Sequence, residues 1–304
     1  MISININNET SQLQDVLVGI AYDFGGTPTI AQCYDPKSKE YVSLGLYPSE
    51  NDCVMAMDAL VSVLKKHNVN VYFPKNIIGL NQIFSRDIAF AIEDKLVLPN
   101  IIEARRNELD AIYEILSQIE ETDIIKMPQN SRAEGGDVIV WNDYIFVGYS
   151  EIEDFEKFTV ARTNRLALDF LASTFTNKKV IGFELNKSDD DSRNNALHLD
   201  CCFQPIGNDM AILYKGGFKH EKDYKFIIDY FNKENIIELN KEEMYNMYSN
   251  VFSISPKVII SDKDFLVLNN KLRKRGFIVE EVSYSEIGKM SGLFRCSTMP
   301  LNRF

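Results

Sequence analysis

Five short apolar segments recur along the chain, and their spacing constrains the fold more than any other feature. They begin at residues 69, 123, 179, 235 and 277, so successive starts lie 54, 56, 56 and 42 residues apart. Each segment is rich in β-branched residues and is typical of a strand. A repeat of this length indicates a structure assembled from similar units. Alternating helices and strands are also typical of any α/β protein, so it is the regular spacing that favours a repeat.

Helical patterns and strand pairs complete the repeated unit. Apolar residues recur every three or four positions in four segments, which precede the first four strand candidates: 53–68, 105–121, 162–177 and 224–235. Three further segments, 86–99, 136–149 and 199–216, each predict two strands joined by a short turn containing Asn, Asp or Gly, and 249–262 is a fourth, weaker copy. No linker or low-complexity stretch interrupts this series. We therefore expect an α/β protein with one domain over residues 1–304.

Charge and composition exclude several classes of function. The net charge is −11, and clustered Lys and Arg of the kind that contact nucleic-acid phosphates are absent. The one basic run, at 271–276, is typical of a solvated helix face. No segment approaches the roughly 20 apolar residues that span a membrane, and the polar N-terminus does not resemble a signal peptide. The five cysteines form no CxxC motif and predict reduced thiols without a zinc site. We expect a cytoplasmic protein.

Polar residues stand at matching points, at the starts of successive strand pairs. They are Asp87 in "FSRD", Glu134 and Asp137 in "EGGD", His198 and Asp200 in "HLD", and Cys296 in "RCST". If the units pack radially, these side chains converge. Each has an ordinary alternative interpretation: a solvated strand end, a glycine turn, a hydrogen-bonded core histidine or a buried inert thiol.

Taken together, these residues indicate a chemistry directed at a cation. A nucleophilic cysteine needs a proton-transfer partner, and His198 is the one histidine at a strand start. Several carboxylates around a thiol raise its pKa and so oppose nucleophilic attack. A guanidinium substrate removes that conflict, because it pairs bidentately with carboxylates and its charge favours the thiolate. An acidic chain also attracts such a cation.

The same series of residues resembles the guanidino-modifying pentein superfamily, which includes arginine deiminases, dimethylarginine dimethylaminohydrolases and amidinotransferases. The resemblance runs from "LQDVLVG" at 13–19 to the "CSTMPL" that begins at Cys296. It implies a five-bladed α/β propeller of ββαβ units. It also implies that no metal or organic cofactor is needed and that the partner is a small guanidino compound. Whether the chain forms a homodimer is left open.

The resemblance further implies a role for each residue. Cys296 attacks the guanidinium carbon, Asp87 and Asp200 hold its nitrogens, Glu134 orients His198, and His198 transfers protons through a covalent thiouronium intermediate. Family members that bind free arginine hold its carboxylate with arginines. The segments "EARRNE" and "ARTNRLALDF" resemble the relevant regions, which makes Arg106 and Arg162 candidates for that role. Surface charge at a helix N-terminus is the alternative for both.

Two departures from the deiminase pattern bear on the substrate and the reaction. Arginine deiminases carry an inserted helical bundle between the first aspartate and "EGGD", whereas 46 residues separate Asp87 from Glu134 here. Their substrate-gripping arginine upstream of the cysteine is replaced by Ser291, and Arg295 stands directly before the cysteine. A hydrolase acting on arginine or a derivative is our first expectation. An amidinotransferase is the alternative, disfavoured because those enzymes typically have Asp in place of Glu134. A propeller that only binds a ligand is the third.

Overall fold

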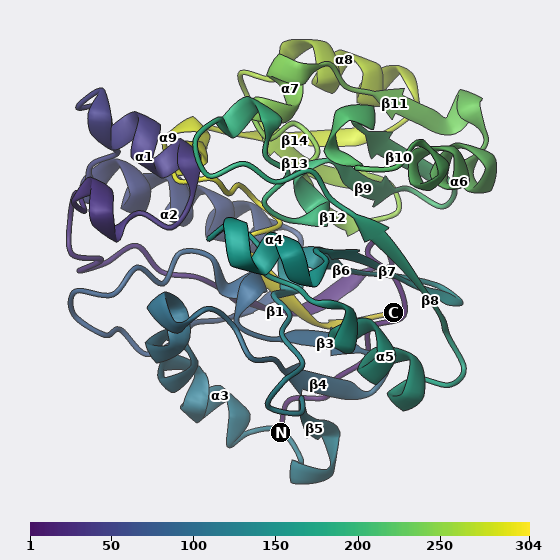
Figure 1. Ribbon diagram of the computed structural model, residues 1–304, viewed down its shortest axis with the longest axis horizontal. Helices are drawn as coiled ribbons and strands as arrows, with labels where there is room; N and C mark the ends of the chain where they lie inside the picture. Colours follow the sequence, from purple (N-terminus) through teal and green to yellow (C-terminus); the bar gives the residue numbers. More distant parts are fainter.

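The computed structural model describes residues 1–304, which form five small sheets of three strands each (Figure 1). In every sheet the middle strand pairs antiparallel with one neighbour and parallel with the other. We call these sheets blades 1 to 5. This repetition confirms the five-unit prediction and the α/β class.

Four blades are continuous in sequence, and each consists of a hairpin, a connection and a parallel third strand. Their strands are β3 (Phe90–Ile92), β4 (Lys95–Leu98) and β5 (Ile124–Lys126) in blade 2; β6 (Val138–Trp141), β7 (Tyr144–Tyr149) and β8 (Lys179–Glu184) in blade 3; β9 (Phe203–Ile206), β10 (Met210–Leu213) and β11 (Ile236–Glu238) in blade 4; and β12 (Phe252–Ser255), β13 (Val258–Asp262) and β14 (Ile278–Val282) in blade 5.

Blade 1 is assembled from both ends of the chain. It consists of β1 (Leu13–Val18), β2 (Asn70–Tyr72) and the last strand, β15 (Thr298–Arg303). The yellow C-terminal strand lies beside the purple N-terminal one in Figure 1, and their antiparallel register pairs Val18 with Thr298. Because Cys296 lies just before β15, this pairing anchors the candidate nucleophile to the N-terminal strand.

Tight turns follow from residues that tolerate a positive φ. The turn between β6 and β7 has Asn142 at φ 52°, and the turn between β9 and β10 has Gly207 at φ 63°. Short hairpin turns require this left-handed conformation, for which Asn and Gly are favoured. All four predicted strand pairs form antiparallel hairpins, but the turn between β3 and β4 has Glu93 at a positive φ, 54°, in place of Asn or Gly.

Helices pack outside the sheets, and three of the four predicted helical segments, 53–68, 162–177 and 224–235, coincide with helices. They are α1 (Pro36–Ser43), α2 (Glu50–Lys66), α3 (Tyr113–Leu116), α4 (Ile152–Lys157), α5 (Arg165–Thr174), α6 (Glu221–Phe231), α7 (Lys241–Tyr245), α8 (Leu266–Lys274) and α9 (Ser285–Gly288). In α2, Ser49 caps the first turn, and the buried side chains recur on one face at Cys53, Ala56, Met57, Leu60 and Leu64. None of these helices has the length and apolar character needed to cross a membrane.

One predicted helix differs from the expectation. Residues 105–121 were expected to form a regular helix, but Glu103–Ile112 is a 3₁₀-helix and only the single turn α3 follows it. The physical reason is Arg105, which turns inward at this point: its guanidinium donates to Phe84 O at 2.9 Å and to the Glu108 carboxylate at 2.8 Å. Burying one residue of this segment so deeply is incompatible with a simple amphipathic face.

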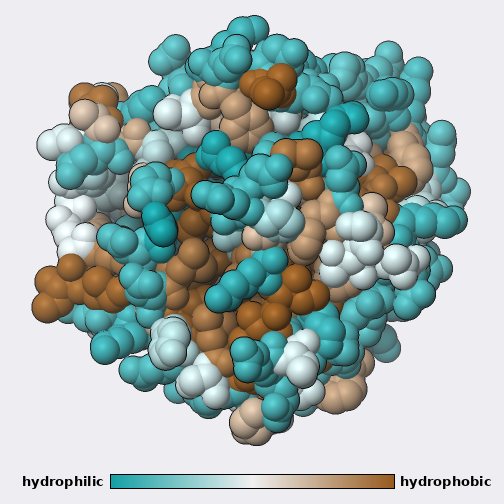
Figure 2. All heavy atoms as spheres, turned by 60° about the horizontal axis from the view of Figure 1, so that its bottom comes forward, coloured by the Kyte–Doolittle hydropathy of each residue, from teal (hydrophilic) through white to brown (hydrophobic).

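Figure 2 shows a mainly hydrophilic face with hydrophobic side chains gathered towards its middle and at its left edge. Across the whole molecule the large hydrophobic side chains with the greatest exposure include Ile78 at 85% and Tyr113 at 73%. Exposed apolar side chains are normal on a folded protein.

Candidate active site

Single turns of 3₁₀-helix stand directly before the first strands of blades 2, 3 and 4. They are Ser85–Asp87, Gly135–Asp137 and Leu199–Cys201. Asp87 and Asp200 lie in these turns, and Glu134 and His198 directly precede two of them. All four are buried, and the blade 1 segment before β15 adds the buried Cys296. The structure thus brings together the polar residues that the sequence places at successive strand starts.

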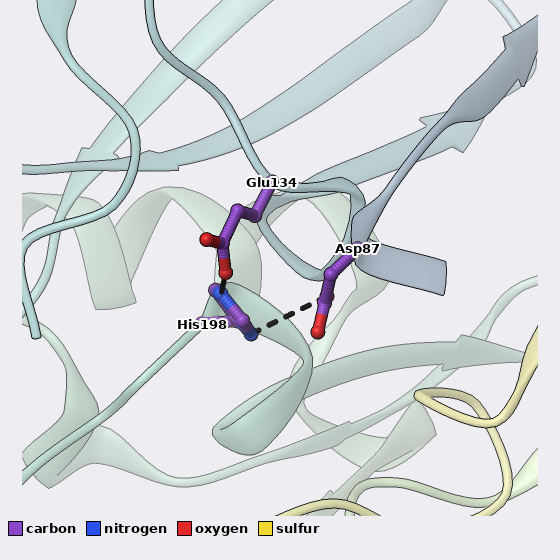
Figure 3. Close-up of side chains that lie close together, drawn as sticks. All are labelled: Asp87, Glu134 and His198. Atoms are coloured by element: carbon purple, nitrogen blue, oxygen red, sulfur yellow. Dashed lines mark hydrogen bonds and ion pairs between the residues drawn. The ribbon is translucent and has the colours of Figure 1, made fainter. Parts of the chain in front are cut away.

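His198 lies between two carboxylates (Figure 3). Its Nε2 is 2.9 Å from Oε2 of Glu134, and its Nδ1 is 3.6 Å from Oδ1 of Asp87. Burial alone would lower the pKa of His198, but Asp87, Glu134 and Asp137 outweigh it and raise the pKa to about 9. The imidazole is therefore held as a cation and can donate a proton to a leaving group.

The raised pKa of His198 predicts how stability depends on pH. The folded state holds this proton up to about pH 9, whereas an unfolded histidine releases it near 6.5. The stabilisation is fully present below the unfolded pKa and is lost as the pH rises towards 9, by roughly 3 kcal/mol in total. We expect the free energies of unfolding of wild type and His198→Gln, measured in urea at several pH values, to converge over that range. Parallel curves would contradict this assignment.

Two buried arginines pair with the carboxylates of the cluster. Arg162 donates from Nη1 to both carboxylate oxygens of Glu134, at 3.0 and 3.2 Å, and from Nη2 to the backbone oxygen of Tyr34. Arg105 donates from Nη1 to Oδ2 of Asp87 at 2.6 Å. Burial raises the pKa of Glu134, but Arg162 and His198 outweigh it and hold this carboxyl well below its usual range. Glu134 is thus an anion that fixes the imidazolium.

The turn "EGGD" needs a glycine at its centre for a steric reason. The backbone N–H of Gly136 donates to Oδ1 of Asp87 at 3.0 Å. A Cβ at this position would lie 2.6 Å from Nδ1 of His198 and 2.8 Å from Oδ1 of Asp87. We expect Gly136→Ala to push the two side chains apart, costing about 1–3 kcal/mol of stability and most of the activity. Thermal unfolding and turnover measure the two effects, and a variant with full activity would contradict this geometry.

The thiol of Cys296 faces Asp200. Its Sγ lies 3.7 Å from Oδ2 of Asp200 and 3.2 Å from Nδ2 of Asn250. Burial raises the pKa of Cys296 well above its usual value, and Asp200 and Asp87 raise it further. In the free protein the thiol is therefore protonated, and a cation placed between the two aspartates would favour its ionisation.

Arg295 anchors Asp200 from behind. Its Nη1 donates to Oδ2 of Asp200 at 2.9 Å, and its Nη2 donates to Oε1 of Glu9 at 3.0 Å. Burial raises the pKa of Glu9, but Arg295 and Arg86 outweigh it and lower the pKa to about 2. The buried charges at the centre of the molecule are thus paired, as burial requires.

One site residue expected from sequence lies elsewhere. Arg106 is exposed, with its nearest carboxylate, Glu103, at 3.7 Å, and it does not reach the cluster. Its neighbour Arg105 occupies that place instead. Arg162, by contrast, is buried against Glu134 rather than exposed on a helix. Sequence reasoning missed Arg105, Asn250 and Glu9. The sequence signal for Arg105 was Glu108, a carboxylate three residues later with which it pairs.

The donor set also bears on metal binding. Asp87, Glu134 and His198 offer ligand atoms within 4.8 Å of one another. In this structure each carboxylate pairs with an arginine, and Glu134 also holds His198. A metal ion bound here would have to displace His198 from Glu134.

Comparison with known proteins identifies the family of the chain. A family model described as N,N dimethylarginine dimethylhydrolase, eukaryotic, matches residues 46–303, a range that contains Asp87, Glu134, His198, Asp200 and Cys296. The chain belongs to this family. The dimethylarginine dimethylhydrolase family is part of the guanidino-modifying pentein superfamily, whose members are enzymes that act on guanidino groups.

This dimethylarginine dimethylhydrolase family member has relatives in sequence and in fold. The uncharacterized protein YkgA of Bacillus subtilis (strain 168) is 32% identical over 245 residues, covering 80% of this chain and 78% of YkgA. The N-terminal domain of ArgZ, an arginine dihydrolase from the ornithine–ammonia cycle in cyanobacteria, aligns with a TM-score of 0.78 and 19% identity, covering 96% of this chain and 98% of that domain.

A transferase shares the architecture to the same degree. SxtG, an amidinotransferase from Microseira wollei in the saxitoxin biosynthetic pathway, aligns with a TM-score of 0.77 and 15% identity, covering 99% of this chain and 97% of SxtG. At such low identities the likenesses show the fold, which is the five-bladed pentein propeller expected from the sequence.

Proposed function

We propose that this protein is a cysteine-dependent hydrolase that acts on the guanidino group of arginine or an arginine derivative. One observation carries the proposal: a buried thiol lies 3.7 Å from a carboxylate, in a cluster that also holds an imidazolium between two further carboxylates. A thiol in this field ionises poorly in the free protein. A substrate that brings its own positive charge supplies what the site lacks.

The proposed reaction has two halves. Asp87 and Asp200 hold the guanidinium, whose charge lets the thiol of Cys296 release its proton to solvent. The thiolate then bonds to the guanidinium carbon, and the departing nitrogen takes a proton from His198 as its C–N bond breaks. The thiouronium that remains is attacked by water, whose proton passes to His198. The C–S bond then breaks and releases a ureido product. Glu134 keeps the imidazole oriented through both halves.

A pocket beside the cluster offers a place for the rest of the substrate. Its volume is about 100 Å³, and its lining contains Tyr34, Asp35, Tyr47 and Phe84 but no lysine or arginine. Tyr34 also accepts a hydrogen bond from Arg162, whose Nε is buried without a partner. Arg162 does not line this pocket, but it is the buried cation next to Tyr34, and we propose it as the partner of an acidic group on the substrate. A substrate that has no carboxylate would leave the ion pair between Arg162 and Glu134 intact.

Product analysis tests this proposal and identifies the substrate. Purified protein is incubated with L-arginine, methylated and acylated arginines, and agmatine, with and without glycine or ornithine as acceptor. We expect ureido product and released ammonia or amine without any acceptor, and none from a Cys296→Ala blank. Turnover that requires an added amine would make the protein an amidinotransferase. No turnover of any guanidine would contradict the proposal.

A further inference from the structure

Blade 5 contributes a residue to the cluster at the point that matches the site residues of the other blades. The turn Met247–Asn250 stands directly before β12, as the 3₁₀ turns stand before β3, β6 and β9, and it is closed by the backbone bond from Asn250 N to Met247 O at 2.9 Å. Asn250 is fully buried. Its place in the repeat is thus equivalent to those of Asp87 and His198.

The side chain of Asn250 is oriented by two backbone donors. Its Oδ1 accepts hydrogen bonds from the backbone N–H groups of Leu293, at 3.2 Å, and Cys296, at 3.1 Å. An amide oxygen accepts and an amide nitrogen donates, so these two bonds fix which end of the amide faces which neighbour. The Nδ2 group must therefore point at Sγ of Cys296, which lies 3.2 Å away.

The surroundings of Cys296 make this N–H donor significant. Most of the other groups near the thiol are acidic or weakly acidic and disfavour its ionisation; they are Asp200 and Cys201 before β9, Asp87 before β3 and Tyr284 after β14. Two groups favour ionisation: the backbone N–H of Leu293 and the guanidinium of Arg295, which pairs with Asp200. A side-chain N–H at hydrogen-bond distance stabilises a sulfur anion far more than a neutral thiol.

We infer that Asn250 is the blade 5 member of the active site, where its amide N–H stabilises the thiolate of Cys296 and its amide oxygen fixes the loop that carries the thiol. This role deepens the proposed function and rests on it. The hydrogen bond from Asn250 stabilises the thiolate once the substrate cation has favoured ionisation of Cys296. The donor is already beside the sulfur at that point. Preorganised donors of this kind need no rearrangement during the reaction.

The substitution Asn250→Asp distinguishes the role of the amide oxygen from the role of the amide N–H. The carboxylate retains an oxygen for the N–H groups of Leu293 and Cys296, so the loop stays anchored, but the donor to sulfur becomes an acceptor. We expect alkylation of Cys296 by iodoacetamide at a fixed alkaline pH, followed by peptide mass spectrometry, to slow by about tenfold or more. Iodoacetamide is uncharged, so its reaction reports on the thiolate and not on cation binding.

A matched control is Asn195→Asp. Asn195 is also a buried asparagine, and its Oδ1 accepts a backbone N–H, that of Ser188 at 3.2 Å, outside the cluster. We expect it to leave Cys296 alkylation unchanged. An unchanged rate in folded Asn250→Asp would overturn the inference. If that variant does not fold, Asn250→Ala removes the same donor without a new charge; slower alkylation is expected there too, and an equal or faster rate would overturn the inference.

This measurement is independent of the reaction proposed for the site. Alkylation needs no guanidine, so a failure of wild type to turn over any guanidine would contradict the proposed function while the effect of Asn250 on the thiol is still measured. The converse result is that wild type turns over guanidines while alkylation is unchanged in the Asn250 variants. That result would overturn the role of Asn250 without contradicting the hydrolase proposal.

Discussion

Replacing Cys296 by alanine is expected to reduce guanidine turnover by at least about 10⁴-fold, to the level of the uncatalysed background. The proposed reaction passes through a carbon–sulfur bond, and nothing else at the centre of the cluster can form it. The other nearby thiol, Cys201, faces the opposite oxygen of Asp200, at 3.8 Å, and burial together with Asp200 raises its pKa well above the usual value. It cannot substitute as the nucleophile.

Stability separates lost chemistry from lost structure in this experiment. The protonated thiol of Cys296 makes only weak hydrogen bonds with Asp200 and Asn250, so we expect Cys296→Ala to unfold at nearly the same temperature as wild type. The matched control is Cys53→Ala, which removes a buried thiol from α2 outside the cluster and is expected to keep full activity with some loss of stability. Equal turnover by the two variants would show that Cys296 is not the nucleophile.

The repeat was readable from the sequence because it is a local property of each unit. Strand and hairpin signals depend on a few adjacent residues, such as Asn142 at the turn of blade 3, and the spacing of the units follows from chain length. The matching positions of Asp87, Glu134, His198 and Cys296 then follow from the repeat itself. These side chains converge because equivalent strand starts of a radial structure meet at its centre.

The remaining residues could not be read because their signals are not local. Arg105 and Arg106 are adjacent and chemically identical, and which of them turns inward depends on the 3₁₀ geometry of Glu103–Ile112. Glu9 is distant in sequence from Arg295 and meets it only when β1 pairs with β15. These contacts exist only in the assembled propeller.

Asn250 differs from these cases, since its position was predictable while its chemistry was not. It stands before the first strand of blade 5, where the repeat predicts a site residue. A neutral amide, however, has no titratable group and no obvious place in a set of carboxylates, an imidazole and a thiol. Its role emerges from the two backbone donors that orient it towards the sulfur.

Replacing His198 by glutamine is expected to lower kcat for guanidine hydrolysis by about 10²–10⁴-fold with little change in KM. Glutamine retains an amide N–H that can donate to Glu134, so the cluster keeps a hydrogen bond where the imidazole was. It cannot transfer a proton to the departing nitrogen. The matched control is His220→Gln, because Nε2 of His220 lies 2.7 Å from Oε2 of Glu184 in a similar pair on the surface. We expect that variant to hydrolyse guanidines at the wild-type rate.

The identity of the leaving group distinguishes proton transfer by His198 from a purely structural role. An S-alkyl isothiourea carries the same positive charge as a guanidine but expels a thiol, which needs far less protonation than an amine. In His198→Gln we therefore expect the first half of the reaction to be restored for this substrate, with a rapid release of about one thiol per active site. The second half still needs a base for the incoming water, so turnover should then stall with the thiouronium attached to Cys296, detectable by mass spectrometry. Continued rapid turnover of the isothiourea by His198→Gln would mean that another group activates the water. No burst at all would mean that the substitution had disrupted the site rather than removed a proton donor.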